Sequence, residues 1–162
     1  MEEKMIKIIF VCHGNICRSP MAEFIFKKMV DERGLASQFV IASAATSTEE
    51  IWNGIGNPVY PPAKAELRKH GISCEGKRAV QLKKNDYDKY DYILGMDSYN
   101  RRNMLRILGK DPKGKVKLLL DYSDSPRDIA DPWYTGEFTT TYNDIVEGCE
   151  AFLDYLENER LI

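Results

Sequence analysis

Runs of consecutive apolar residues alternate along this chain with segments in which apolar residues recur every three or four positions. The runs predict buried β-strands and the periodic segments predict helices, an alternation typical of parallel β-α-β units. We predict strands over Met5–Cys12, Phe39–Ala44, Tyr90–Met96 and Val116–Leu120. We predict helices over Pro20–Arg33, Tyr60–His70, Ser98–Leu108 and Thr139–Glu159, with a helical turn over Leu82–Tyr87. The pattern therefore predicts a single three-layer α/β domain over residues 1–162, with a four-stranded parallel sheet flanked by helices.

Two connections between these elements are long for a compact domain, at residues 45–59 and 121–140. Both follow predicted strands, so both leave the sheet at its carboxyl edge, where open α/β sheets bind their ligands. Connections of this length are usually functional or disordered. We therefore expect them to border one site, together with the segment that follows the first strand.

The segment after the first strand reads Cys-His-Gly-Asn-Ile-Cys-Arg-Ser, residues 12–19. Gly14 and Asn15 tolerate the positive φ angles that align successive backbone amides around an anion. The helix that follows adds the positive end of its dipole. A cysteine at the entrance of such a loop is stabilised as a nucleophilic thiolate, and Arg18 offers a forked donor suited to a phosphoryl group. The segment therefore predicts covalent phosphoryl chemistry on Cys12.

Ser19 and Pro20 allow two interpretations. Serine is a preferred N-cap and proline a preferred first helical residue, which would do no more than start the helix. The Ser19 hydroxyl could instead donate a hydrogen bond to the Cys12 sulfur and ease its departure as a leaving group. Because a hydroxyl can donate and accept at once, both roles stay open.

A phosphocysteine mechanism also needs a group that protonates the leaving oxygen and later activates water. The last long connection holds four candidate carboxylates, those of Asp121, Asp124, Asp128 and Asp131. We favour Asp131, because Pro132 stiffens the backbone after it and the aromatic residues Trp133 and Tyr134 would desolvate it. These two aromatic residues and His13 could also wall a slot for an aromatic group. For Trp52, slot wall and simple loop packing are equally open.

Composition narrows the class of protein and of partner. The chain has 23 basic and 25 acidic residues, so it carries no basic footprint for nucleic acid. No apolar run approaches the roughly 20 residues of a membrane span, and the N-terminal run is too short for a signal peptide. Without a secretion signal, we expect a cytoplasmic protein with four reduced cysteines. Their spacing and the presence of only two histidines argue against zinc. A transient disulfide between Cys12 and Cys17 stays open.

Residues 11–20, Val-Cys-His-Gly-Asn-Ile-Cys-Arg-Ser-Pro, resemble the signature loop of the low-molecular-weight protein tyrosine phosphatases. The resemblance covers nearly the whole chain, because further family features match in order at residues 43–47, 56–72, 90–97 and 131–133. It implies a flavodoxin-like fold and a two-step reaction without metal or cofactor. Cys12 would attack phosphotyrosine to form a cysteinyl phosphate, Arg18 would bind the phosphate, and Asp131 would be the general acid and then the base.

The same resemblance implies roles for other side chains. The expected substrate-binding residues are His13, Gly14, Asn15, Ile16, Cys17, Arg18, Trp133 and Tyr134. Ser19 and Ser43 would join Asn15 in a network that fixes the loop, and Glu23 and His70 would form a pair that supports it from behind. We expect a phosphotyrosine-containing protein as substrate, phosphate or another oxyanion in the loop, no membrane insertion, and a monomer or weak dimer.

Three related classes fit the residues less well. Arsenate reductases with a similar loop need a further cysteine pair, and this chain offers only Cys74 in its middle and Cys149 near its end. Protein-arginine phosphatases of the family typically carry threonine where this chain has Ile16. A phosphotransfer component would not need both Arg18 and Asp131.

The chain departs from the family in having His13 at an aliphatic wall position, extra residues around Trp52, and Trp133 where tyrosine is more usual.

Overall fold

The computed structural model describes residues 4–162, and it confirms the predicted α/β architecture around a parallel sheet. The four strands lie in the order β2-β1-β5-β6, and each pairs in parallel with its neighbours. Their bounds are Ile6–Cys12 for β1, Phe39–Ala45 for β2, Tyr92–Gly95 for β5 and Val116–Leu118 for β6. Because β1 is flanked on both sides, its carboxyl end lies near the middle of the sheet edge.

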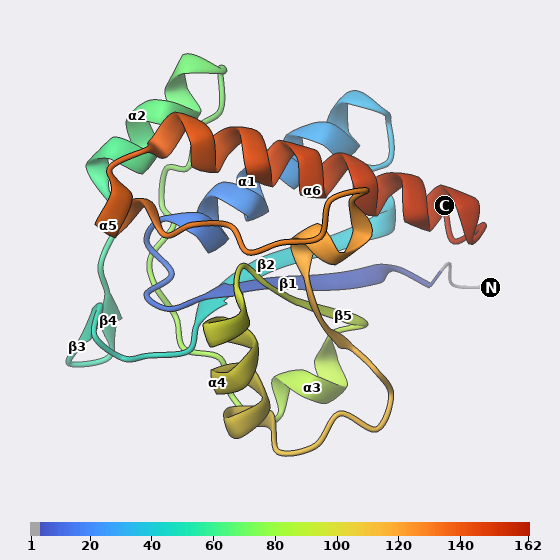
Figure 1. Cartoon of the computed structure of the whole chain (residues 1–162), viewed down its shortest axis with the longest axis horizontal. Coiled ribbons are helices and arrows are strands. Elements are labelled where there is room, and N and C mark those ends of the chain that lie inside the picture. Colours follow the sequence, from blue (N-terminus) through green and yellow to red (C-terminus); the bar gives the residue numbers. More distant parts are fainter. Residues whose placement is uncertain (1–3) are drawn as a thin grey trace.

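Helices cover both faces of the sheet (Figure 1). On one face lie α1 and α6 with α2, and on the other lie α3 and α4. Their bounds are Arg18–Glu32 for α1, Pro61–Lys69 for α2, Asp86–Lys89 for α3, Ser98–Leu108 for α4, Pro132–Thr135 for α5 and Phe138–Asn158 for α6. Single 3₁₀ turns at Ala36–Gln38 and Leu119–Tyr122 complete the main framework.

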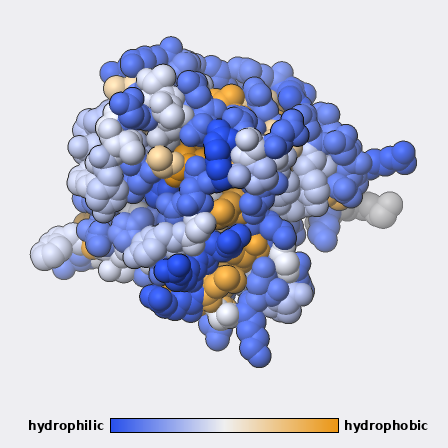
Figure 2. Space-filling view, viewed as in Figure 1, coloured by the Kyte–Doolittle hydropathy of each residue, from blue (hydrophilic) through white to orange (hydrophobic). Residues whose placement is uncertain are grey.

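The central strand explains why the apolar runs signal buried strands. In β1, Ile8 and Phe10 pack into the core under α1 and α6, while Ile9 and Val11 pack into the core on the α4 side. A strand buried on both faces reads as a continuous hydrophobic run rather than as an alternation. The face drawn in Figure 2 is mainly hydrophilic, with a narrow band of hydrophobic residues near its middle.

Local structure differs from prediction in the connections. The strand predicted to reach Leu120 ends at Leu118, whose backbone N–H bonds to the Asp121 carboxylate as a 3₁₀ turn begins. The helical turn expected at residues 82–87 forms later, as α3. The 121–140 connection contains the short helix α5 rather than irregular chain alone.

The 45–59 connection contains a small β-hairpin that the hydrophobic pattern misses. Strands β3 (Ile51–Trp52) and β4 (Ile55–Gly56) pair antiparallel around Asn53 and Gly54, which have φ angles of 50° and 76°. An Asn-Gly turn with two positive φ angles matches the twist of a tight hairpin. In Figure 1 this hairpin lies at the same end of the sheet as α5 and the β1–α1 loop.

None of the helices within residues 4–162 combines the length and hydropathy needed to cross a membrane.

The packing of α6 against Leu119 yields a stability prediction. A Cβ atom added at Gly148 would lie 2.5 Å from Leu119 Cγ. We expect Gly148→Ala to lower the free energy of unfolding by about 1–3 kcal/mol through overpacking. Urea denaturation measures this, with the exposed α6 residue Glu150 changed to Ala as the control. Equal stability of Gly148→Ala and the control would contradict the packing described here.

Candidate active site

The loop between β1 and α1 is shaped around Asn15. This residue has a φ of 60° and a side chain that is buried behind the loop. Its side-chain NH₂ donates to Ser19 Oγ at 2.7 Å and to Ser43 Oγ at 3.0 Å, and its side-chain oxygen accepts from the Val80 N–H at 3.0 Å. The loop is thereby attached to β2 and to the segment after α2. The side chain of Asn15 thus lies behind the loop and is not among the groups that line the pocket.

The sulfur of Cys12 lies within reach of three donors. The backbone N–H groups of Asn15 and Ser19 lie 3.3 and 3.4 Å away, and Ser19 Oγ lies 3.0 Å away. Ser19 Oγ accepts from Asn15, so its single proton goes either to the sulfur at 3.0 Å or to the Ala44 carbonyl at 3.4 Å, and the sulfur is the nearer of the two acceptors. Such donors stabilise a thiolate. Of the two interpretations left open for Ser19, the N-cap is wrong, because α1 begins at Arg18 and Cys17 is its N-cap residue.

The other cysteines have environments that favour the neutral thiol. Burial, together with the negative charges of Cys12 and Asp131, raises the pKa of Cys17 far above its ordinary value. Burial also raises the pKa of Cys74 and of Cys149. Because only the thiolate is strongly nucleophilic, these three residues are poor competitors for an electrophile.

Arg18 is a buried cation held by acceptors from two distant segments. Its Nη1 donates to Asp97 Oδ2 at 2.6 Å and to the Ile129 carbonyl at 2.8 Å, and its Nη2 lies 3.4 Å from Asp131 Oδ2. Burial alone would lower the pKa of Arg18, but the negative charges of Cys12, Asp97 and Asp131 outweigh it and raise the pKa. The guanidinium therefore stays charged beside the sulfur.

Asp97 is a site residue that the sequence analysis missed. It is the N-cap of α4 and forms a capping box with Asn100. The Asp-Ser step after the third predicted strand is a visible helix-start signal, but a cap explains it fully. Only the fold shows that the second carboxylate oxygen of Asp97 bonds to Arg18.

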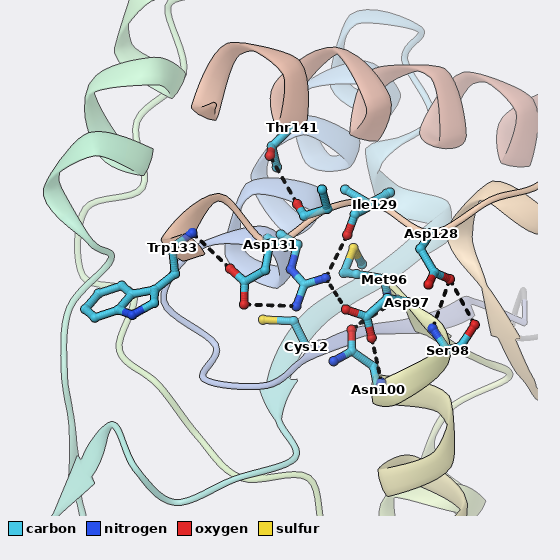
Figure 3. A network of polar contacts seen from close by, with 12 residues as sticks. Cys12, Met96, Asp97, Ser98, Asn100, Asp128, Ile129, Asp131, Trp133 and Thr141 are labelled. Atoms are coloured by element: carbon cyan, nitrogen blue, oxygen red, sulfur yellow. Dashed lines mark hydrogen bonds and ion pairs between the residues drawn. The ribbon is translucent and has the colours of Figure 1, made fainter. Parts of the chain in front are cut away.

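The segment carrying Asp131 is fixed at several points (Figure 3). The Ile129 N–H donates to the Met96 carbonyl at 2.9 Å, and Asp128 Oδ1 accepts from both the N–H and the hydroxyl of Ser98 at 3.0 Å. Asp131 itself is the N-cap of α5 and accepts from the Trp133 N–H at 3.0 Å. Its carboxylate is thereby directed toward Arg18 and the mouth of the pocket.

These groups meet in one pocket. It is lined by Cys12, His13, Gly14, Ile16, Cys17, Arg18, Glu49, Glu50, Asp131, Trp133 and Tyr134. The two long connections therefore border the same site as the β1–α1 loop. Trp52 lies on the β3–β4 hairpin with 79% of its surface exposed and is not among the lining residues. Glu49 and Glu50 are lining residues that the sequence analysis did not single out.

The support behind the loop corrects the expected pairing of Glu23 with His70. Glu23 accepts from the Ser43 hydroxyl at 2.6 Å and from Lys27 at 2.6 Å, and Lys77 Nζ lies 3.6 Å away. Lys77 also donates to the Ser43 carbonyl at 3.0 Å, and burial lowers its pKa. The cation beside Glu23 and Ser43 in this buried layer is thus Lys77, which the sequence analysis missed.

His70 belongs to a different cluster, where the end of α2 packs against α6. Its Nε2 lies 3.1 Å from Glu66, one helical turn earlier, and its ring stacks on Tyr142 at 3.8 Å between centroids. An i, i+4 partner on the same helix satisfies it locally. No group of three or more potential metal ligands occurs within residues 4–162.

The chemistry of this arrangement is that of a nucleophile beside an anion site. Cys12 supplies the sulfur, the loop N–H groups and Arg18 supply the donors, and Asp131 supplies a titratable oxygen at the entrance. Preorganised donors of this kind stabilise negative charge that develops in a transition state.

Alkylation of the thiols tests the environment of the sulfur. We expect iodoacetate at roughly pH 6 to modify Cys12 on the order of tenfold or more faster than Cys17, because only the Cys12 thiolate is stabilised by donors. Peptide mass spectrometry after timed quenching measures the order of labelling. Comparable labelling of Cys17 in the folded protein would contradict the assignment.

The comparisons with known proteins agree with this geometry. The family model described as "Low molecular weight phosphotyrosine protein phosphatase" matches residues 7–161. The low molecular weight protein-tyrosine-phosphatase YfkJ of Bacillus subtilis is 39% identical over 96% of this chain and 99% of its own length. Its crystal structure superposes with a TM-score of 0.89 over 96% of this chain and 97% of the other.

Two further similar proteins extend the comparison. The low molecular weight phosphotyrosine protein phosphatase of Gallus gallus is 42% identical over 91% of this chain and 93% of its own. The structure of a Drosophila arginine phosphatase is 31% identical, with a TM-score of 0.81 over 93% of this chain and 97% of the other. By the extent of the family match and of these identities, the chain belongs to the low molecular weight phosphotyrosine protein phosphatase family.

Proposed function

We propose that this protein is a protein tyrosine phosphatase that hydrolyses phosphotyrosine through a cysteinyl-phosphate intermediate. The observation that carries this proposal is the position of the Cys12 sulfur among three donors, in one pocket with the buried Arg18 and with Asp131. Family membership and the names of the relatives above support the substrate class.

In the first step the Cys12 thiolate attacks phosphorus in line with the tyrosyl oxygen. A sulfur–phosphorus bond forms while the bond from phosphorus to the leaving oxygen breaks, and the electron pair of that bond goes to the oxygen. The loop N–H groups and Arg18 stabilise the charge on the equatorial oxygens. Protonated Asp131 gives its proton to the leaving oxygen.

In the second step the Asp131 carboxylate takes a proton from water as the water oxygen attacks phosphorus. The sulfur–phosphorus bond breaks, its electron pair returns to Cys12, and inorganic phosphate leaves. The Ser19 hydroxyl stabilises the departing thiolate at 3.0 Å. No metal or cofactor enters either step as proposed.

The pocket walls favour an aromatic leaving group. Trp133 and Tyr134 stand on the side of Asp131, and His13 stands on the side of the β3–β4 hairpin. Trp133 is held in place by Tyr60, with 4.7 Å between ring centroids. Ile16 also points to phosphotyrosine rather than phosphoarginine, by the resemblance noted above. A cytoplasmic location and a monomeric or weakly dimeric state stay predictions.

Two substitutions test the assigned roles. Cys12→Ser should leave no measurable turnover of a phosphotyrosine peptide. Asp131→Ala should lower kcat/KM for that peptide by roughly 10²–10⁴-fold, because the poor tyrosyl leaving group depends on protonation. The loss should be much smaller for an aryl phosphate with a highly acidic leaving group. Full activity of Cys12→Ser, or equal losses on both substrates for Asp131→Ala, would contradict the mechanism.

A comparison of substrates tests the proposed class. Peptides of one sequence that carry phosphotyrosine, phosphoserine or phosphoarginine at the same position are assayed for released phosphate. We expect turnover mainly of phosphotyrosine, because only its ring fills the aromatic slot. Faster hydrolysis of phosphoarginine would assign the protein instead to the activity named for the Drosophila neighbour.

The attachment of Asp128 to Ser98 generates a further prediction. Asp128→Ala removes both hydrogen bonds to Ser98 and should misplace Asp131, lowering kcat/KM for phosphotyrosine by about tenfold. Activity on the aryl phosphate with the acidic leaving group should change little. Asp128→Asn keeps an acceptor and should stay close to wild type. An equal loss on both substrates, or no rescue by asparagine, would show that Asp128 does not position the acid.

A further inference from the structure

We infer that the pocket wall formed by Glu49, Glu50 and His13 selects phosphotyrosine segments with a lysine or arginine beside the phosphotyrosine. This inference rests on the proposed function and specifies its substrate class. It concerns only the residues that flank the phosphotyrosine, because the phosphoryl group itself lies in the Cys12–Arg18 loop.

Glu49 and Glu50 are fixed parts of the pocket wall. Glu50 accepts from the Asn57 side-chain NH₂ at 2.7 Å, and its carbonyl accepts from the Asn57 N–H at 2.8 Å. Glu49 Oε2 lies 3.0 Å from His13 Nε2, and this contact links Glu49 to the β1–α1 loop. Both residues line the pocket and directly precede the β3–β4 hairpin. The two carboxylates therefore lie where a substrate that enters the pocket would contact them.

The charge of these carboxylates is only partly balanced. The partner of Glu50 is a neutral amide, and His13 offsets Glu49 only when its imidazole is protonated. The side chain of Glu49 is 71% exposed, so its carboxylate remains accessible from solvent. Across the pocket, Arg18 is already paired with Asp97 and Asp131. The entrance on the hairpin side is thus negative even though the base of the loop binds an anion.

With this charge distribution, the phosphoryl group contacts the positive base of the pocket, whereas the residues beside the phosphotyrosine contact its negative rim. A phosphotyrosine in the loop holds its flanking residues at the rim, within reach of Glu49. An acidic flanking residue would face like charge there, whereas a lysine or arginine would form an ion pair. Ion pairs at exposed sites are individually weak and screened by salt. The preference should therefore be modest and should depend on ionic strength.

His13 sets how much of this negative charge is available. Its ring lies 6.2 Å from that of Tyr99 on α4, so it is packed between α4 and Glu49. Replacing it with leucine removes the partner of Glu49 and leaves the carboxylate unpaired. We therefore expect His13→Leu to increase the preference for basic neighbours, the opposite direction to a loss of Glu49.

The test uses two phosphotyrosine peptides that differ only in having lysine or glutamate on both sides of the phosphotyrosine. For the wild-type protein at low ionic strength, we expect kcat/KM to be about tenfold higher for the lysine peptide. The ratio should fall toward one in about 0.5 M salt. It should also fall in the variant with Glu49→Gln and Glu50→Gln, and stay at the wild-type value in Glu150→Gln, whose carboxylate lies on α6.

The outcomes separate this inference from the proposed function. Hydrolysis of both peptides at equal rates, a preference for the glutamate peptide, or a preference that persists in the double variant would overturn the inference and leave the phosphatase function intact. Failure of the wild-type protein to hydrolyse either peptide would overturn the proposed function. A graded loss of preference from wild type to the double variant, with Glu150→Gln unchanged, would support the inference.

Discussion

The buried charge of Arg18 imposes a requirement on the rest of the site, because a buried cation has to be matched by nearby acceptors. The guanidinium meets this requirement with Asp97 at the start of α4 and with Ile129 and Asp131 before α5. Three segments that are far apart in sequence are thereby held around the Cys12 sulfur. The ion cluster thus fixes where the proposed nucleophile, the anion donors and the proposed acid lie relative to one another.

The two nitrogens at the end of Arg18 are used unequally, and this bears on phosphate binding. Nη1 donates two hydrogen bonds, at 2.6 and 2.8 Å, and these fix the plane of the guanidinium. Nη2 makes only a long contact of 3.4 Å with Asp131. A phosphoryl oxygen can take this weakly used donor without disturbing the strong pair. The cation is therefore oriented before substrate arrives, which is the condition under which fixed donors accelerate a reaction.

How well a feature could be predicted from the sequence depended on how far apart along the chain its interacting residues lie. Strands buried on both faces and the Cys12–Arg18 loop are local patterns, and the structure places them as the sequence predicts. The Asn53-Gly54 hairpin had a local signal, but its strands of two residues are too short to show a period. Asp97 had only a helix-start signal and Lys77 had none, because their contacts to Arg18 and Glu23 span 79 and 54 residues. For His70, the local partner Glu66 prevailed over the expected distant one.

The layer behind the loop determines the direction of the hydrogen bond that reaches the sulfur. Lys27 and Lys77 lie beside Glu23, whose carboxylate accepts the Ser43 proton. Ser43 can then only accept from the Asn15 side-chain NH₂, which has two protons and gives the other to Ser19. Ser19 Oγ is thereby an acceptor from Asn15, and its own proton has two acceptors in reach, Cys12 at 3.0 Å and the Ala44 carbonyl at 3.4 Å, of which Cys12 is the nearer. A hydrogen-bond chain that starts at the Glu23 carboxylate thus leaves the Ser19 hydroxyl able to donate to the Cys12 thiolate.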